Sequence, residues 1–172
     1  MAKKLKESEE RFRNLMENID AVAVQGYGPD GTTQYWNKAS ERLYGYNRQE
    51  AIGRNILDLK IPSEMKGDVA KAIREMAESG QPIPSGELLL MHKDGSRIPV
   101  ISNHAIVKVP GCEQEFFCLD VDITERKRIE RELFLKENII KSSSCAIATC
   151  DLEGNMTYGN PFFQKLWGFD GP

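Results

Sequence analysis

The residues of this chain that could do chemistry together lie in two alternating apolar segments. Ser102 and His104 are two positions apart in the first segment, and Asp120 lies in the second. Alternate residues of a strand point to one face, so Ser102 and His104 share a face with Val100. If Asp120 faces the same way, the three side chains form a polar patch in an apolar chamber, which suits a small polar ligand. Alternatively, they are hydrogen-bonded core residues or lie exposed at a sheet edge.

The same three residue types occur in hydrolases, but the rest of the sequence does not support catalysis. A kinase core needs a phosphoacceptor histidine on a long helix and glycine-rich nucleotide-binding boxes, whereas His92 and His104 lie in a strand-turn-strand region. No Gly-x-x-x-x-Gly-Lys-Ser/Thr motif occurs. We therefore expect no catalytic residues and no enzyme activity in this segment.

The four cysteines form no Cys-x-x-Cys motif, and neither histidine has a metal-ligand spacing to them. We expect reduced, structural thiols and no metal site. The cysteines are Cys112, Cys118, Cys145 and Cys150.

Apolar residues upstream could complete a ligand pocket. The candidates are Tyr35 and Trp36 in an early strand and Met65 and Val69 on one stripe of a later helix. Aromatic and methionine side chains at these spacings also occur in ordinary cores, and this alternative stays open.

A repeat organises the chain, with an offset of 123 positions as between residues 23 and 146. Residues at turns, caps and core positions coincide: Ala23, Gly31, Tyr35, Asn37, Leu43 and Gly45 fall on Ala146, Gly154, Tyr158, Asn160, Leu166 and Gly168. Each copy predicts a hairpin, an asparagine that caps a short helix, and a glycine that ends it. One supersecondary unit therefore begins twice.

The change of period along the first copy predicts an α+β fold, a five-stranded antiparallel sheet with short helices on one face. The expected strands cover residues 21–25, 33–36, 83–91, 96–107 and 114–121, and the expected helices cover 38–44, 49–57 and 63–78. We assign residues 21–124 to this domain and 142–172 to an incomplete second copy. Since about 35 residues cannot bury a core, we expect a version ending near Lys141 to be at least as soluble.

Charged helices flank the domain. Residues 1–20 predict an amphipathic helix, with Leu5, Phe12, Leu15, Met16 and Ile19 on one face. Residues 125–141 predict a linker helix capped by Thr124, with Ile129, Leu133 and Ile140 near heptad spacing. The linker is either a solvated connector or a short parallel coiled coil that transmits a signal.

The composition excludes several classes of protein. The net charge of −3 comes without a basic stripe, so we expect no nucleic-acid partner. The longest apolar runs are four residues, so we expect no membrane contact in this segment, and the basic start is no secretory signal, so we expect a cytoplasmic location. Phe117, Leu119 and Val121 give the last strand an apolar outer face, which predicts a homodimer through the N-terminal helix and the sheet face.

Several motifs taken together resemble the PAS domain family with its PAC segment, over about residues 8 to 124. They are the Asp-Gly hairpin, Tyr35-Trp36-Asn37-Lys38-Ala39, Leu43-Tyr44-Gly45-Tyr46, Ile52-Gly53-Arg54, His92-Lys93-Asp94-Gly95-Ser96 and Asp122-Ile123-Thr124-Glu125-Arg126-Lys127. The resemblance implies a sensory module that binds a small ligand or mediates dimerisation and passes its signal through Asp122, Ile123 and Thr124 to an output domain. A histidine kinase is the expected output. A diguanylate cyclase, a transcriptional regulator or a ligand-free dimerisation scaffold are the alternatives.

The resemblance also bears on cofactors. Asp120 matches the position of the pocket glutamine in flavin-binding members, but residues 50–59 contain no cysteine to bond a flavin. Haem-binding members supply an axial histidine from the long helix, and residues 63–78 contain none. Covalent flavin and haem are therefore disfavoured, and the ligand is expected to be another small molecule.

Overall fold

The computed structural model describes residues 7, 10–11, 14–108, 111 and 113–168. The chain divides into two compact units, Met1–Thr124 and Glu125–Pro172. Of the expected N-terminal helix, residues 7, 10–11 and 14–18 are helical, and Leu5 and Phe12 lie outside the described residues.

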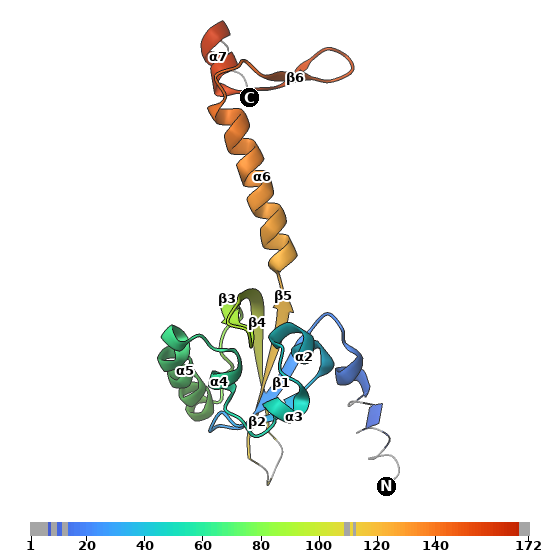
Figure 1. The fold of residues 1–172 in the computed structure, drawn as a ribbon, viewed down its shortest axis with the longest axis vertical. Helices are drawn as coiled ribbons and strands as arrows, with labels where there is room; N and C mark the ends of the chain where they lie inside the picture. The colour runs from blue at the N-terminus through green and yellow to red at the C-terminus, as the bar shows by residue number, and fades with distance from the viewer. Residues whose placement is uncertain (1–6, 8–9, 12–13, 109–110, 112, 169–172) are drawn as a thin grey trace. The chain divides into compact units, whose positions relative to one another are not determined.

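A five-stranded antiparallel sheet forms the first unit, which confirms the α+β fold predicted from the sequence (Figure 1). The strands are β1 (Ala23–Tyr27), β2 (Thr33–Trp36), β3 (Gly86–Met91), β4 (Arg97–Val107) and β5 (Glu115–Asp122). Their spatial order is β2-β1-β5-β4-β3, so the first and last strands of this sheet in chain order, β1 and β5, are paired in its interior. The first strand begins two residues later than expected, because residues 20–21 form a bend.

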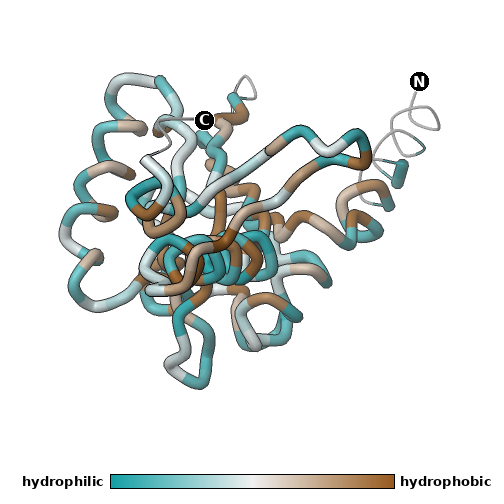
Figure 2. Tube along the Cα trace, turned by 90° about the horizontal axis from the view of Figure 1, so that it is seen from above, coloured by the Kyte–Doolittle hydropathy of each residue, from teal (hydrophilic) through white to brown (hydrophobic). Residues whose placement is uncertain are grey.

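Short helices connect the two halves of the sheet. They are α2 (Lys38–Tyr44), α3 (Arg48–Ala51), α4 (Ile56–Lys60), the 3-10 turn η1 (Ser63–Met65) and α5 (Lys66–Ser79). The single helical piece expected at 49–57 is two helices, because Gly53 takes a left-handed conformation and Asn55 caps a new helix by accepting from Leu57 N. Along α5, hydrophilic and hydrophobic stretches alternate, as expected for a helix with one face on the core (Figure 2).

The register of the sheet decides which side chains face the helices. Ser102 pairs with Asp120, and both His104 and Gln25 pair with Cys118. Because directly paired residues point to the same face, these five side chains share the inner face of the sheet.

The aromatic core packs where α2 meets the sheet. Trp36 and Tyr44 are fully buried with ring centroids 5.7 Å apart, and Trp36 Nε1 donates to the Tyr46 carbonyl at 3.0 Å. Burying each such side chain contributes roughly 2–3 kcal/mol. This packing holds α2 against β1 and β2.

The second unit repeats the start of the first. It contains the hairpin of β6 (Ala148–Cys150) and β7 (Met156–Gly159), then α7 (Pro161–Trp167), and it includes nearly all of α6 (Thr124–Ser142). Asn160 caps α7 by accepting from Phe163 N, as Asn37 caps α2 by accepting from Ser40 N. The repeat found in the sequence is therefore present in the hydrogen bonds. Residues 169–172 of the expected second copy lie outside the described residues.

Gly45 offers a test of the packing at the end of α2. Its φ is 77°, and an added Cβ would clash with the His92 ring, whereas Gly53, with φ 83°, has open space around it. We expect Gly53→Ala to lower the free energy of unfolding by about 1 kcal/mol, from backbone strain alone. Gly45→Ala should cost about 1–3 kcal/mol more, because the His92 ring must move. Urea denaturation of both variants measures this difference, and equal losses would contradict the His92 contact.

Candidate ligand-binding site

A cavity of about 250 Å³ lies between the inner face of the sheet and the helices α4 and α5. Its walls are apolar and consist of Ile56, Ile61, Met65, Val69, Ala72, Ile73, Ile83, Leu88 and Leu90. The remaining lining residues bring polar groups or sulfur to it: Tyr27, Lys60, Asp68, Ser102, His104 and Cys118.

The structure brings together four of the seven pocket residues expected from the sequence. Met65, Val69, Ser102 and His104 all line the cavity. Asp120 is fully buried beside them, paired with Ser102 across β4 and β5.

Tyr35 and Trp36 lie elsewhere, and the expectation that they line this cavity needs correction. Trp36 faces inward but packs on Tyr44 in the aromatic core. Tyr35 faces the outer side of the sheet, where its ring centroid is 6.4 Å from that of Phe117. Neighbouring residues of a strand point to opposite faces, so these two could not both have lined one cavity.

A buried ion pair stands behind the polar side of the cavity. Lys60 Nζ lies 2.5 Å from Asp120 Oδ2, and the two side chains are 2% and 0% exposed. Tyr44 OH donates to the same oxygen at 2.7 Å. Burial alone would raise the pKa of Asp120, but the Lys60 charge and the hydrogen bonds that the carboxylate accepts together outweigh it and lower that pKa below its ordinary value. Likewise, burial would lower the pKa of Lys60, but the Asp120 charge, together with Cys118 and the hydrogen bonds to both, outweighs it and raises that pKa. Both groups are therefore ionised, and their charges cancel.

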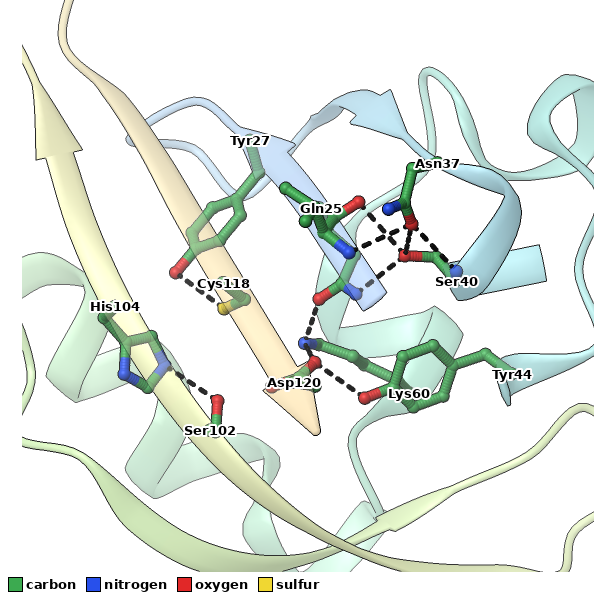
Figure 3. A network of polar contacts seen from close by, with 11 residues as sticks. Gln25, Tyr27, Asn37, Ser40, Tyr44, Lys60, Ser102, His104, Cys118 and Asp120 are labelled. Atoms are coloured by element: carbon green, nitrogen blue, oxygen red, sulfur yellow. Dashed lines mark hydrogen bonds and ion pairs between the residues drawn. The ribbon is translucent and has the colours of Figure 1, made fainter. Parts of the chain in front are cut away.

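The ion pair continues into a buried hydrogen-bond network (Figure 3). Lys60 Nζ donates to Gln25 Oε1 at 2.5 Å, and Gln25 Nε2 donates to Ser40 Oγ at 2.9 Å. Lys60 Nζ also lies 5.3 Å from the ring centroid of Tyr44, close enough for a cation–π contact. The ammonium group is thus surrounded by acceptors, as a buried cation requires.

Ser102 and His104 form the polar floor of the cavity. Ser102 Oγ and His104 Nε2 are 3.5 Å apart, the outer limit of a hydrogen bond, and His104 Nδ1 is buried without a partner among the described residues. Burial lowers the pKa of His104, and the nearby Lys60 charge lowers it further, so the imidazole is neutral at pH 7. Asp120 bonds Lys60 and Tyr44 and does not orient His104. The three residues therefore offer ligand contacts, without the base-orienting bond of a hydrolase triad.

Cys118 lies deeper in the same face. Its Sγ is 3.6 Å from Tyr27 OH, and burial raises the pKa values of both the Cys118 thiol and the Tyr27 phenol. A protonated, buried thiol is a poor nucleophile. Cys145 and Cys150 are exposed free thiols, and Cys112 lies outside the described residues. Among the residues that the structure describes, no three His, Cys, Asp or Glu side chains are grouped to hold a metal ion.

Sequence reasoning missed Lys60, Gln25 and Tyr44 as site residues. A signal for Lys60 existed, because it follows Ile56 by four positions and therefore shares the apolar face of its helix. Gln25 alternates with Ala23 and Tyr27 on one face of a strand that is otherwise apolar. A polar residue at such a position indicates a buried hydrogen-bond network.

Asp122, Ile123 and Thr124 lie where β5 leads into α6. Asp122 Oδ1 accepts from Thr124 N at 2.7 Å, and the buried Ile123 donates its N–H to the Pro99 carbonyl at 3.0 Å. An open depression of about 430 Å³ borders this point. Asp120 lines this depression and is not among the residues that line the cavity. We do not regard the depression as the ligand site, because its carboxylates already have partners, as Asp20 has Arg42 and Asp120 has Lys60.

The described helices include none that is both long enough and apolar enough to cross a bilayer.

The chain is similar to known proteins in sequence. Residues 19–125 match the family model described as the PAS domain. The chain is 42% identical over 143 residues to the oxygen sensor protein DosP of Escherichia coli, covering 78% of this chain and 17% of that protein. It is 25% identical over 165 residues to sporulation kinase E of Bacillus subtilis, covering 94% of this chain and 20% of that protein.

A solved structure is similar in fold as well as in sequence. The PAS domain of an HTR-like protein from Haloarcula marismortui superimposes with a TM-score of 0.57 at 26% identity, covering 71% of this chain and 97% of that domain. The chain spans a fifth or less of the two full-length relatives, 20% and 17%.

Proposed function

Because this chain belongs to the PAS domain family, we propose that its first unit is the sensory input of a larger signalling protein and that it binds a small, uncharged, mostly apolar molecule in the cavity beside α4 and α5. The observation that carries the proposal is an apolar cavity whose one buried charge pair is already neutral.

The neutral ion pair argues for an uncharged ligand. Lys60 is the cation at the cavity, and Asp120 already cancels its charge. A ligand carboxylate would bring a third, unpaired charge into an apolar site, where desolvation costs several kcal/mol, and the exposed carboxylate of Asp68 in the lining would repel it. An uncharged molecule avoids this cost.

The polar floor argues for one hydrogen-bonding group on the ligand. Neutral His104 keeps an unpartnered Nδ1, and its contact with Ser102 is long enough to give way to a ligand hydroxyl or carbonyl. The rest of the ligand would contact aliphatic side chains. A volume of about 250 Å³ limits it to a small molecule.

The output is part of the same proposal. One relative is named as a kinase and another as an oxygen sensor, and α6 leaves the domain directly after the Asp122-Ile123-Thr124 segment. We infer that these residues transmit the ligand state through α6 to a histidine kinase, or to a diguanylate cyclase or transcriptional regulator, in the cytoplasm. This segment would act by binding, with no catalytic step of its own.

A second candidate function is dimerisation without a ligand. The outer face of the sheet carries half-buried apolar side chains, among them Phe117, Leu119 and Val121, and Leu89 is 51% exposed. Such a face can associate with a second copy of the chain. In that case the cavity would have no regulatory ligand.

A pair of matched probes tests the ligand class. We expect 2-naphthol, an uncharged aromatic alcohol, to bind and to raise the thermal midpoint of the full chain, and 2-naphthoate to bind about tenfold or more weakly because its carboxylate cannot be paired. Ala72→Phe, which fills the cavity, should abolish naphthol binding. Lys71→Phe on the solvent side of the same helix, at a side chain 70% exposed, should not.

Two results would count against the proposal. Equal binding of 2-naphthol and 2-naphthoate would contradict the inference that the neutral ion pair disfavours a charged ligand. Equal naphthol binding in the two variants would show that the probe binds outside the cavity. Mass spectrometry of molecules carried through purification adds an independent readout, in which a charged metabolite or a macrocyclic cofactor would contradict the proposed class, and an empty cavity that also rejects naphthol would favour the dimerisation scaffold.

A further inference from the structure

One asparagine side chain joins three parts of the first unit. Asn37 Oδ1 accepts from Val24 N at 3.0 Å and from Ser40 N at 2.9 Å. Its Nδ2 donates to the carbonyls of Val22 at 3.0 Å and Met16 at 3.1 Å. Since residues 14–18 are helical, this carboxamide fastens the helical segment before the domain to both β1 and α2. We call this set of bonds the asparagine clamp.

A continuous chain of hydrogen bonds connects the clamp with the cavity (Figure 3). Lys60 donates to Gln25 at 2.5 Å, and Gln25 donates to Ser40 at 2.9 Å. The single hydroxyl proton of Ser40 has two acceptors, Asn37 Oδ1 at 2.9 Å and the carbonyl of Val24, itself bonded to Asn37, at 3.0 Å. Asn37 then donates to Met16. We call the path from Lys60 to Asn37 the polar relay.

The relay lies entirely out of water. Gln25, Asn37 and Ser40 are 0% exposed, and Lys60 is 2% exposed. A buried group that loses its partner cannot turn to water instead, so each member depends on the next. A shift of the Lys60 ammonium toward a ligand would leave Gln25 Oε1 without its donor.

The second unit contains an equivalent of the clamp but no equivalent of the relay. Asn160 accepts from Ile147 N at 3.0 Å and Phe163 N at 2.9 Å, and it donates to the carbonyls of Cys145 and Ile140, the latter at the end of α6. The clamp is therefore repeated. The residues that correspond to Gln25 and Ser40 are Ala148 and Phe163, whose side chains cannot form the relay. Since the clamp forms without a relay, the relay is an addition to the unit that has the cavity.

We propose that the polar relay couples the cavity to the helical segment at residues 14–18, so that a change at Lys60 alters how firmly Asn37 holds that segment. Regulation would then leave the domain through its entry helix as well as through α6. The inference rests on the proposed function only in treating the cavity as the input. The experiment below uses no ligand, so its outcome is independent of whether the proposed ligand class is right.

Hydrogen exchange of the backbone amides at residues 14–18 in the full chain tests the coupling. Gln25→Met keeps the side-chain length and the Lys60–Asp120 pair but interrupts the relay. We expect it to raise the exchange rate at residues 14–18 by about threefold or more, because the segment opens more often. Tyr44→Phe also removes one buried hydrogen bond at Asp120, but outside the relay, and should leave these rates unchanged.

A double-variant cycle gives the decisive result. In an Asn37→Ala background the clamp is absent, so adding Gln25→Met should no longer change the exchange at residues 14–18. An effect that persists in that background, or no effect of Gln25→Met in the natural sequence, would overturn the proposal. Exchange in β4 serves as the reference for global unfolding. If Gln25→Met accelerates β4 as well, Ser40→Ala, which cuts the next link, replaces it in the same cycle with the same two criteria.

Discussion

Replacing Lys60 by methionine is expected to lower the free energy of unfolding by about 3–5 kcal/mol at pH 7, because it leaves Asp120 buried and unpaired. The methionine fills most of the lysine volume, so the loss reports the missing charge and not a cavity. Urea denaturation followed by circular dichroism measures it.

Two variants control for other causes. Lys66 forms an ion pair with Asp58 at the same 2.5 Å distance, but the two side chains are 39% and 57% exposed, so Lys66→Met should cost about 1 kcal/mol or less. Adding Asp120→Asn to Lys60→Met removes the unpaired charge and keeps an acceptor for Tyr44 OH, so the double variant should recover more than half of the loss. A double variant as unstable as Lys60→Met would show that the ion pair is not the reason.

The pH dependence of the same variants should differ in sign. In the natural sequence, the Asp120 pKa is lowered by Lys60, so its contribution to stability is present above the ordinary aspartate pKa and is lost as pH falls through the folded value. In Lys60→Met, burial without a cation raises the Asp120 pKa, so stability falls as pH rises above about 4. The gap between the two proteins should therefore be smaller at pH 4.5 than at pH 7.5. A constant gap across that range would mean that Asp120 does not change its protonation.

Asn37→Ala is expected to lower the free energy of unfolding by about 2–4 kcal/mol, because it removes a helix cap and also leaves buried backbone groups unpaired. The affected groups are the buried N–H of Val24 in β1 and the part-buried carbonyls of Val22 and Met16. Asn47 provides the matched control. It caps α3 through Glu50 N in an exposed capping box, so Asn47→Ala should cost only about 1 kcal/mol. Equal losses of unfolding free energy in the two variants would show that Asn37 acts only as an ordinary helix cap.

These two large effects come from the same physical situation. Lys60 and Asn37 are polar side chains with almost no access to water, and each satisfies several partners at once. Their removal is costly because the partners remain buried, and not because any single hydrogen bond is strong. The exposed counterparts Lys66 and Asn47 make bonds of similar length, but we expect their removal to cost little free energy of unfolding because water replaces the lost partner.

Much of the local structure could be predicted from the sequence because it depends on neighbours along the chain. Asparagine caps and left-handed glycines bound the short helices after each hairpin, at Asn37 and Gly45 and again at Asn160 and Gly168. Capping and turn chemistry involve residues a few positions apart, so these assignments needed no tertiary information. Strand alternation likewise placed Ser102 and His104 on one face.

The candidate site could be predicted only in part. Its aliphatic helix stripe and polar strand face followed from periodicity, and the cavity indeed contains Met65, Val69, Ser102 and His104. The placement of Tyr35 and Trp36 at the same site did not follow from alternation, since adjacent strand residues point to opposite faces.

Only the tertiary structure decided that Lys60 meets Asp120 and Gln25. Along the chain, Lys60 on α4 is 60 positions from Asp120 on β5 and 35 positions from Gln25 on β1. Their contact depends on the strand order, in which β1 and β5 pair at the centre of the sheet, and on the position of α4, from which the Lys60 side chain reaches both strands. Sequence periodicity tells which face a side chain occupies but not which distant segment covers that face. The partner of a buried charge is therefore chosen by long-range packing, and with it the neutral wall of the cavity and the polar relay.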